Sequence, residues 1–116
     1  MELVQRNGLL APAAFWELSP EKKAEICNGC GAKAARVDFV PDGVLGAKFT
    51  PACDIHDFMY WLGEDKREAD RVFLHNLIVC CGVNCDEELL YAARVEMAIV
   101  YFKAVSAFGE DSFGDK

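Results

Sequence analysis

The run CDIHDFMY, residues 53–60, carries the side chains best suited to chemistry in this chain. On a helix, His56 and Tyr60 share a face because they are four residues apart, whereas Asp57 lies about 100° further around the axis. An imidazole with a near-neutral pKa can act as a general base, and a carboxylate is a hard ligand for a cation. These residues are therefore the raw material for general-base catalysis beside a cation ligand, although a His-Asp pair is common and by itself is more often structural.

A general base needs an acid to orient its imidazole, and Asp70 is the candidate. It lies at the edge of the apolar stripe of a second predicted helix, and a short turn makes the two helices antiparallel neighbours. Asp70 could then meet His56 across the gap. The alternative is an ordinary ion pair of Asp70 with Lys66 or Arg67 on a solvated face. His75 has no acid at a useful spacing, and we expect it to be structural.

The chain contains six cysteines, at positions 27, 30, 53, 80, 81 and 85. An even number suggests three disulfides, with 15 connectivities allowed. The first residues lack the basic stretch and long apolar run of a secretory signal peptide. The chain is therefore either a mature form with an added Met1 or a protein not exported by that route.

The first half of the chain is expected to hold one short helix and a long loop. Pro20 suits the first turn of a helix that begins at Ser19 and ends by Gly29. Residues 29–50 are rich in glycine and form a long loop, with a hairpin between 36–40 and 44–49. Long structured loops tend to be functional.

The second half is expected to be helical. Thr50 would cap a helix with Pro51 at its first position, running to about Leu62, where Gly63 ends it. A further helix spans about 65–81 with a buried stripe at helical spacing. The last runs from residue 84 or 86 to 108. Charged residues interrupt its apolar sequence and favour a buried helix over a membrane span: Arg94, Glu96 and Lys103.

Length and composition predict one soluble globular domain across residues 1–116, with an N-terminal segment at 1–18 and a flexible tail at 110–116. The chain is 53% hydrophobic and 27% charged, which excludes a disordered protein. Its net charge of −7 excludes nucleic acid as a partner and disfavours an anionic membrane surface. All the excess negative charge lies in residues 51–116.

Three segments carry a resemblance to a known family. ACDIHDFMY, residues 52–60, resembles the active-site helix of the secreted phospholipase A2 superfamily, and EADRVFLHNL, residues 68–77, resembles its antiparallel second catalytic helix. With the closing segment YFKAVSAFG, the chain is most similar to the small bacterial and fungal branch over residues 27–109. The resemblance implies an all-α bundle with two antiparallel catalytic helices, a long calcium-binding loop and a long C-terminal helix.

The resemblance also implies an activity, the calcium-dependent hydrolysis of the sn-2 acyl ester of a glycerophospholipid. His56 would be the base that activates water, Asp70 would hold its tautomer, and Tyr60 would hydrogen-bond to that acid. The substrate would be phospholipid at a membrane or micelle surface. The family further implies a secreted protein, and we expect a monomer.

The same resemblance supplies a metal site and a disulfide. Asp57 would ligate Ca²⁺, with the Asn28 side chain and the Gly29 carbonyl as further ligands. Cys30 would bridge Cys53 and tie this loop to the catalytic helix.

We also expect a short bridge from Cys85 to Cys80 or Cys81, which leaves Cys27 for the remaining sulfur or unbridged. Apolar residues near the N-terminus would either rim an acyl-binding mouth or cover the core: Leu9, Leu10, Phe15 and Trp16.

Two other classes of protein stay open. A domain of the same fold could bind calcium or lipid without turnover. The cysteines could instead form a zinc or redox site, although zinc gives no reason for the spacing of His56, Asp57 and Tyr60.

Overall fold

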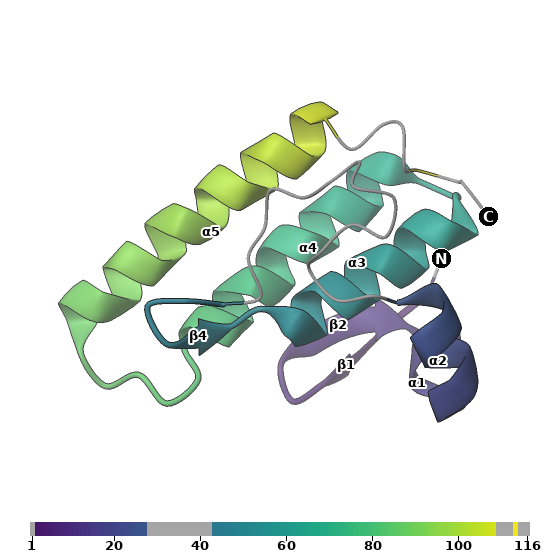
Figure 1. The fold of residues 1–116 in the computed structure, drawn as a ribbon, viewed down its shortest axis with the longest axis horizontal. Helices are drawn as coiled ribbons and strands as arrows, with labels where there is room; N and C mark the ends of the chain where they lie inside the picture. The colour runs from purple at the N-terminus through teal and green to yellow at the C-terminus, as the bar shows by residue number, and fades with distance from the viewer. Residues whose placement is uncertain (1, 28–42, 109–112, 114–116) are drawn as a thin grey trace.

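The computed structural model describes residues 2–27, 43–108 and 113, which form five helices and two short hairpins. The elements follow one another along the chain as shown in Figure 1: β1 (Leu3–Arg6), β2 (Leu9–Pro12), α1 (Ala13–Trp16), α2 (Pro20–Ile26), β3 (Gly43–Val44), β4 (Ala47–Lys48), α3 (Thr50–Leu62), α4 (Lys66–Cys81) and α5 (Glu88–Phe108). The described chain is mostly helical, as expected, but the two antiparallel hairpins mean that it is not all-α.

Helices α3, α4 and α5 lie side by side, with α4 between the other two (Figure 1). Each runs antiparallel to the next, because the connections between them are short. The helices predicted at 50–62 and 65–81 are confirmed within a residue. No helix in the described ranges is long and apolar enough to cross a membrane.

Local signals in the sequence account for most of the helix ends. The Ser19 side chain accepts a hydrogen bond from the Lys22 amide at 3.1 Å, and Gly63 ends α3 with a left-handed φ of 67°. Two predicted boundaries differ. Thr50 is the first residue of α3 rather than its cap. α5 begins at Glu88 rather than at residue 84 or 86: Asn84 has a positive φ of 51°, and the Glu87 side chain accepts from the Leu89 amide at 3.1 Å.

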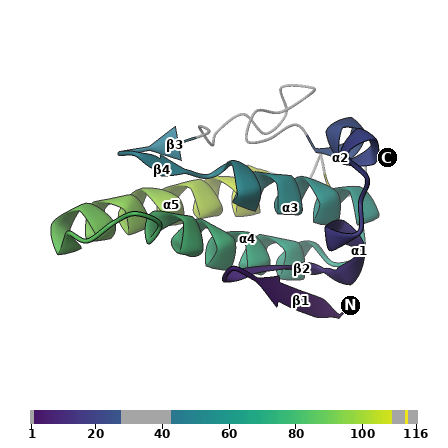
Figure 2. The ribbon, with the colours of Figure 1, turned by 90° about the horizontal axis from the view of Figure 1, so that it is seen from below.

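The N-terminal hairpin was not predicted, although its turn carries a strong signal. Asn7 and Gly8 both have positive φ, which two-residue hairpin turns require. β2 then lies along α4 (Figure 2), where the buried Asn76 side chain exchanges two hydrogen bonds with the backbone of Leu10, at 2.8 and 2.9 Å. An amide on a helix thus takes the place of a neighbouring strand.

The second hairpin is shorter than predicted. Gly43–Val44 pairs with Ala47–Lys48 around a turn at Leu45 and Gly46, both with positive φ. The expected second arm, 44–49, therefore folds back on itself, and the expected first arm, 36–40, lies outside the described residues.

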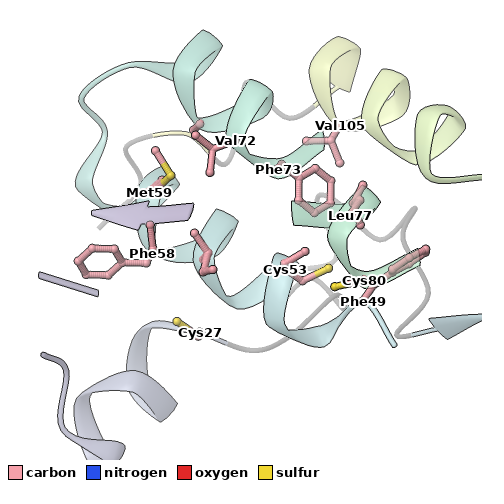
Figure 3. Close-up of a cluster of buried hydrophobic side chains, with 14 of the residues drawn as sticks. Cys27, Phe49, Cys53, Phe58, Met59, Val72, Phe73, Leu77, Cys80 and Val105 are labelled. Carbon is pink, nitrogen blue, oxygen red and sulfur yellow. The ribbon is translucent and has the colours of Figure 1, made fainter. Parts of the chain in front are cut away.

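The core fills the space between the three long helices, and Figure 3 shows part of it. Apolar side chains from α3, its N-cap residue Phe49, α4 and α5 meet there: Phe49, Ile55, Met59, Phe73, Leu77 and Val105. Phe15 is buried, and Leu9, Leu10 and Trp16 pack against this cluster, so all four apolar N-terminal residues cover the core.

Candidate active site

Helices α3 and α4 bring His56 and Asp70 together in the protein interior. The His56 Nε2 atom lies 2.9 Å from Asp70 Oδ1, and the two residues are only 6% and 3% exposed. The Tyr60 hydroxyl donates to the same carboxylate oxygen at 2.6 Å. One turn of α3 thus presents both His56 and Tyr60 to a single carboxylate on α4.

Lys66 completes the surroundings of Asp70. Its Nζ donates to Asp70 Oδ2 at 2.8 Å and to the Ser106 carbonyl of α5 at 2.9 Å. Both interactions of Asp70 that the sequence left open are therefore formed. One carboxylate oxygen contacts His56, and the other accepts a hydrogen bond from Lys66. Arg67, the other candidate partner, is exposed.

Aromatic rings fix the imidazole from two sides. The ring centroids of Tyr60 and Phe73 lie 4.0 and 4.4 Å from that of His56. Phe113 packs edge-on against Tyr60 at 5.2 Å. These contacts leave the imidazole little freedom to rotate, so the orientation set by Asp70 is held by packing as well.

Burial and hydrogen bonding set the ionisation of the pair. Burial lowers the pKa of His56, and the neighbouring Asp70 only partly opposes this effect. For Asp70, burial would raise the pKa, but hydrogen bonds from His56, Lys66 and Tyr60 outweigh it and the pKa is lowered. At neutral pH the pair is therefore a neutral imidazole and an ionised carboxylate.

This ionisation also fixes the tautomer of His56. An ionised carboxylate only accepts hydrogen bonds, so the imidazole proton sits on Nε2 and Nδ1 keeps its lone pair. Nδ1 makes no hydrogen bond within the described residues, where no buried side-chain nitrogen or oxygen lacks a partner. The lone pair of Nδ1 is therefore the one that can accept a proton.

The expected calcium ligands fall partly outside the described residues. Asp57 is half-buried on α3, on the helix face next to that of His56, and Asn28 and Gly29 lie outside the described ranges. Within those ranges, no three side chains of the His, Cys, Asp or Glu type come together as a metal site. One carboxylate fits Ca²⁺, which accepts carbonyl and water oxygens for its other positions.

The cysteines differ in part from expectation. Cys53 is disulfide-bonded, and Cys30, its expected partner, lies outside the described residues. The expected bridge from Cys85 to Cys80 or Cys81 is not formed, because all three are free thiols.

The free thiols at this end of α4 lie in different surroundings. Cys81 is fully buried at the end of the helix, whereas the Cys85 thiol lies against the Glu87 carbonyl at 3.6 Å in the following connection. The Cys27 thiol donates to the Asp54 carbonyl at 3.2 Å.

The structure gives the surroundings of three further residues that the sequence analysis mentioned. Lys66, weighed only as a competing partner of Asp70, belongs to the same cluster as His56. His75 is structural as expected: its Nε2 lies 2.9 Å from the Gly8 carbonyl. Arg94 is buried, which the sequence signalled only as a charge inside an apolar helix.

Comparisons of the chain with protein-family models, with curated proteins and with solved structures find no match.

Proposed function

We propose that this protein hydrolyses the sn-2 acyl ester of glycerophospholipids with calcium, using His56 as a general base. One observation carries the proposal: His56 Nε2 lies 2.9 Å from an Asp70 oxygen that also accepts from Tyr60. The contact brings together the residues to which the phospholipase A2 resemblance assigns the roles of base, acid and supporting donor. A buried histidine with a purely structural role would be satisfied by Asp70 alone. It would not require the second donor, the Tyr60 hydroxyl, on the same Asp70 oxygen.

The chain's own residues supply the proton transfers. Nδ1 of His56 takes a proton from a water molecule as the water oxygen bonds to the acyl carbon. The ionised Asp70 stabilises the imidazolium that results. When the tetrahedral intermediate collapses, the ester C–O bond breaks and the imidazolium returns the proton to the leaving alkoxide. The products are a fatty acid and a lysophospholipid.

Calcium held by Asp57, together with the Asn28 and Gly29 oxygens of the loop, would polarise the acyl carbonyl and stabilise the negative charge on its oxygen. Asp57 follows His56 directly in α3, so the rigid helix backbone fixes the positions of the two residues relative to one another.

Fatty-acid release from phosphatidylcholine vesicles tests this proposal. We expect release with millimolar calcium and none with excess chelator. Asp57→Asn should abolish the calcium-stimulated release and weaken calcium binding, measured by calorimetry, because it removes a hard carboxylate. Asp54→Asn, three residues earlier on α3, is the matched control.

Each outcome has a separate meaning. Equal calcium affinity in wild type and Asp57→Asn would place the metal elsewhere. Calcium binding without any release would favour the non-catalytic lipid- or calcium-binding domain over the hydrolase.

A further inference from the structure

Arg94 of α5 is a buried cation whose described partners are all backbone carbonyls. The residue is 5% exposed; Nε donates to the Leu45 carbonyl at 2.9 Å, and Nη1 to those of Cys81 and Val83 at 3.0 and 3.3 Å. These contacts tie the β3–β4 turn to the end of α4. No carboxylate of the described residues pairs with Arg94, so its charge is solvated by dipoles but not neutralised.

The second terminal nitrogen, Nη2, is not used in these contacts. A Cβ atom placed on Gly46 would lie 3.0 Å from Nη2, so the turn passes close beside this nitrogen. In the described chain no buried side-chain nitrogen or oxygen is left without a partner. Arg94 and Gly46 both line a cavity at this turn.

The cavity has a volume of about 370 Å³ and is lined by residues of the β3–β4 hairpin and of the α4–α5 connection. Figure 1 shows these two segments at the same end of the molecule. Its apolar wall comes from three segments: Leu9 of β2, Pro51 of α3, and Val79 with Val83 at the end of α4. It is separate from the candidate active site, since Cys80 on its wall is about 15 Å from Asp70 along α4 at 1.5 Å per residue.

The polar side of the cavity is cationic. Lys48, exposed on β4, lines it together with Arg94, and no acidic side chain of the described residues does. Lys48 makes no ion pair with the rest of the described chain. Two cations line this cavity in a protein whose net charge is −7.

We propose that this cavity binds an amphiphilic monocarboxylate, with its carboxylate between Arg94 and Lys48 and its hydrocarbon chain against Leu9, Val79 and Val83. A carboxylate can accept from Nη2 and from the lysine ammonium at once. The apolar wall requires a hydrocarbon part, which an inorganic anion would leave in contact with water.

The size and rim of the cavity set the length of that chain. A volume of about 370 Å³ is near the lower end for small-molecule sites, which suits a medium-length chain better than a whole lipid. Val83 is 59% exposed and Leu45 in the adjoining turn is 51% exposed. These side chains extend the apolar surface outward, where a longer tail could leave the cavity.

Equilibrium binding of octanoate to the full chain tests the proposal, with no need for hydrolysis. Titrations in chelator, followed by calorimetry, keep the result independent of the proposed enzyme activity. We expect octanoate to bind at least tenfold more tightly than acetate, which lacks the chain, and than octanamide, which lacks the charge. Octyl phosphate distinguishes a carboxylate site from a phosphate site, and we expect it to bind more weakly than octanoate.

Two pairs of surface variants locate the site. Val83→Glu should weaken octanoate binding at least tenfold by placing a negative charge on the cavity wall. Val100→Glu, a change at a similarly exposed valine on α5 and away from the cavity, should alter binding less than twofold. Lys48→Gln should weaken binding about two- to fivefold, the range for a partly exposed charge pair, and Lys103→Gln should not.

The proposal is overturned if either cavity variant behaves like its control, or if octyl phosphate binds more tightly than octanoate. It is also overturned if the amide resonances that octanoate shifts are those of His56 and Tyr60 rather than Gly46 and Val83. None of these results bears on the hydrolysis of phospholipid, which the vesicle assay tests separately.

Discussion

The two ends of α4 hold buried charges that are stabilised in different ways. Near the start of the helix, Asp70 is surrounded by side-chain donors from His56, Tyr60 and Lys66. Beyond its end, Arg94 is surrounded by backbone carbonyls, including that of Cys81, the last residue of the helix. The first charge is neutralised by a counter-ion within the described chain, and the second is not.

This difference separates a site built for proton transfer from one built for charge attraction. Both carboxylate oxygens of Asp70 are in hydrogen bonds, so Asp70 would act on the proton transfer only through His56. The guanidinium of Arg94 lies at the C-terminus of α4, where aligned carbonyls favour a cation. It keeps part of its charge available to a ligand. An arginine stays protonated at every relevant pH, whereas the pair of His56 and Asp70 titrates.

The largest expected effect is on turnover at the Asp70 end. His56→Ala should reduce phospholipid hydrolysis by about 100- to 10,000-fold, the usual contribution of general-base catalysis. His75→Ala is the matched control. His75 lies on another face of α4 and, among the described residues, contacts only the Gly8 carbonyl, so this variant should hydrolyse phospholipid within about twofold of the wild-type rate.

Asp70→Asn divides the roles within the same cluster. It should lower the initial rate less than His56→Ala does, since the acid orients the imidazole and does not take the proton from water. Full activity in this variant would leave Asp70 as a structural partner of Lys66, and full activity in His56→Ala would remove the catalytic interpretation altogether.

At the other end the expected effect is on stability. Arg94→Met should lower the free energy of unfolding by about 2–4 kcal/mol, because three carbonyls lose a charged donor and the turn loses its link to α4. Arg71→Met should change it by less than about 0.5 kcal/mol, since that side chain is 72% exposed and lies 3.8 Å from Glu68. Urea denaturation at pH 7 measures both, and equal losses would refute the role assigned to Arg94.

A smaller effect distinguishes the two ends by pH. The pKa values of His56 and Asp70 are both lowered by folding, so the unfolded chain binds more protons as the pH falls. The contribution of His56 to stability is present above pH 6.5 and is lost as the pH falls below it; that of Asp70 is lost below about pH 4. His56→Gln should therefore flatten the fall in urea midpoint between pH 7 and pH 5. An unchanged slope would assign that dependence to other groups.

The smallest effects concern the thiols beside Arg94. Burial raises the pKa of Cys81 to about 11, and Cys80 is raised in the same way. In the native protein, iodoacetamide should modify Cys85 first and these two only after unfolding, as peptide mapping would show. Rapid native alkylation of Cys81 would mean that the end of α4 opens readily.

The sequence was sufficient where local rules apply. The spacing of His56 and Tyr60, with a short turn before α4, predicts the contact with Asp70 because helix geometry and antiparallel packing leave few alternatives. It could not divide Asp70 between His56 and Lys66, since both partners are compatible with the spacing and the two carboxylate oxygens are distinguished only in three dimensions.

Long-range pairing accounts for what was missed. Asn7 and Gly8 carry a hairpin signal that could have been used, but nothing near Leu10 indicates that its backbone bonds Asn76. In the same way, the sequence shows Arg94 only as a charge inside an apolar helix. Its carbonyl partners lie outside that helix, in the β3–β4 turn and at the end of α4, and no local pattern indicates them. The disulfide expected at Cys81 and Cys85 is not formed, because closeness in the sequence does not ensure the geometry that a disulfide requires.

The bond between Asn76 and the backbone of Leu10 also has a consequence for the order in which the chain acquires its structure during synthesis. The β1–β2 hairpin is local and can form as soon as its residues leave the ribosome, but its two anchoring bonds span 66 residues. The segment that is made first is thus secured late, after α4 has emerged. Until then the nascent hairpin exposes the apolar face that will cover the core, and this is the stage at which a chaperone that binds apolar segments would meet the chain.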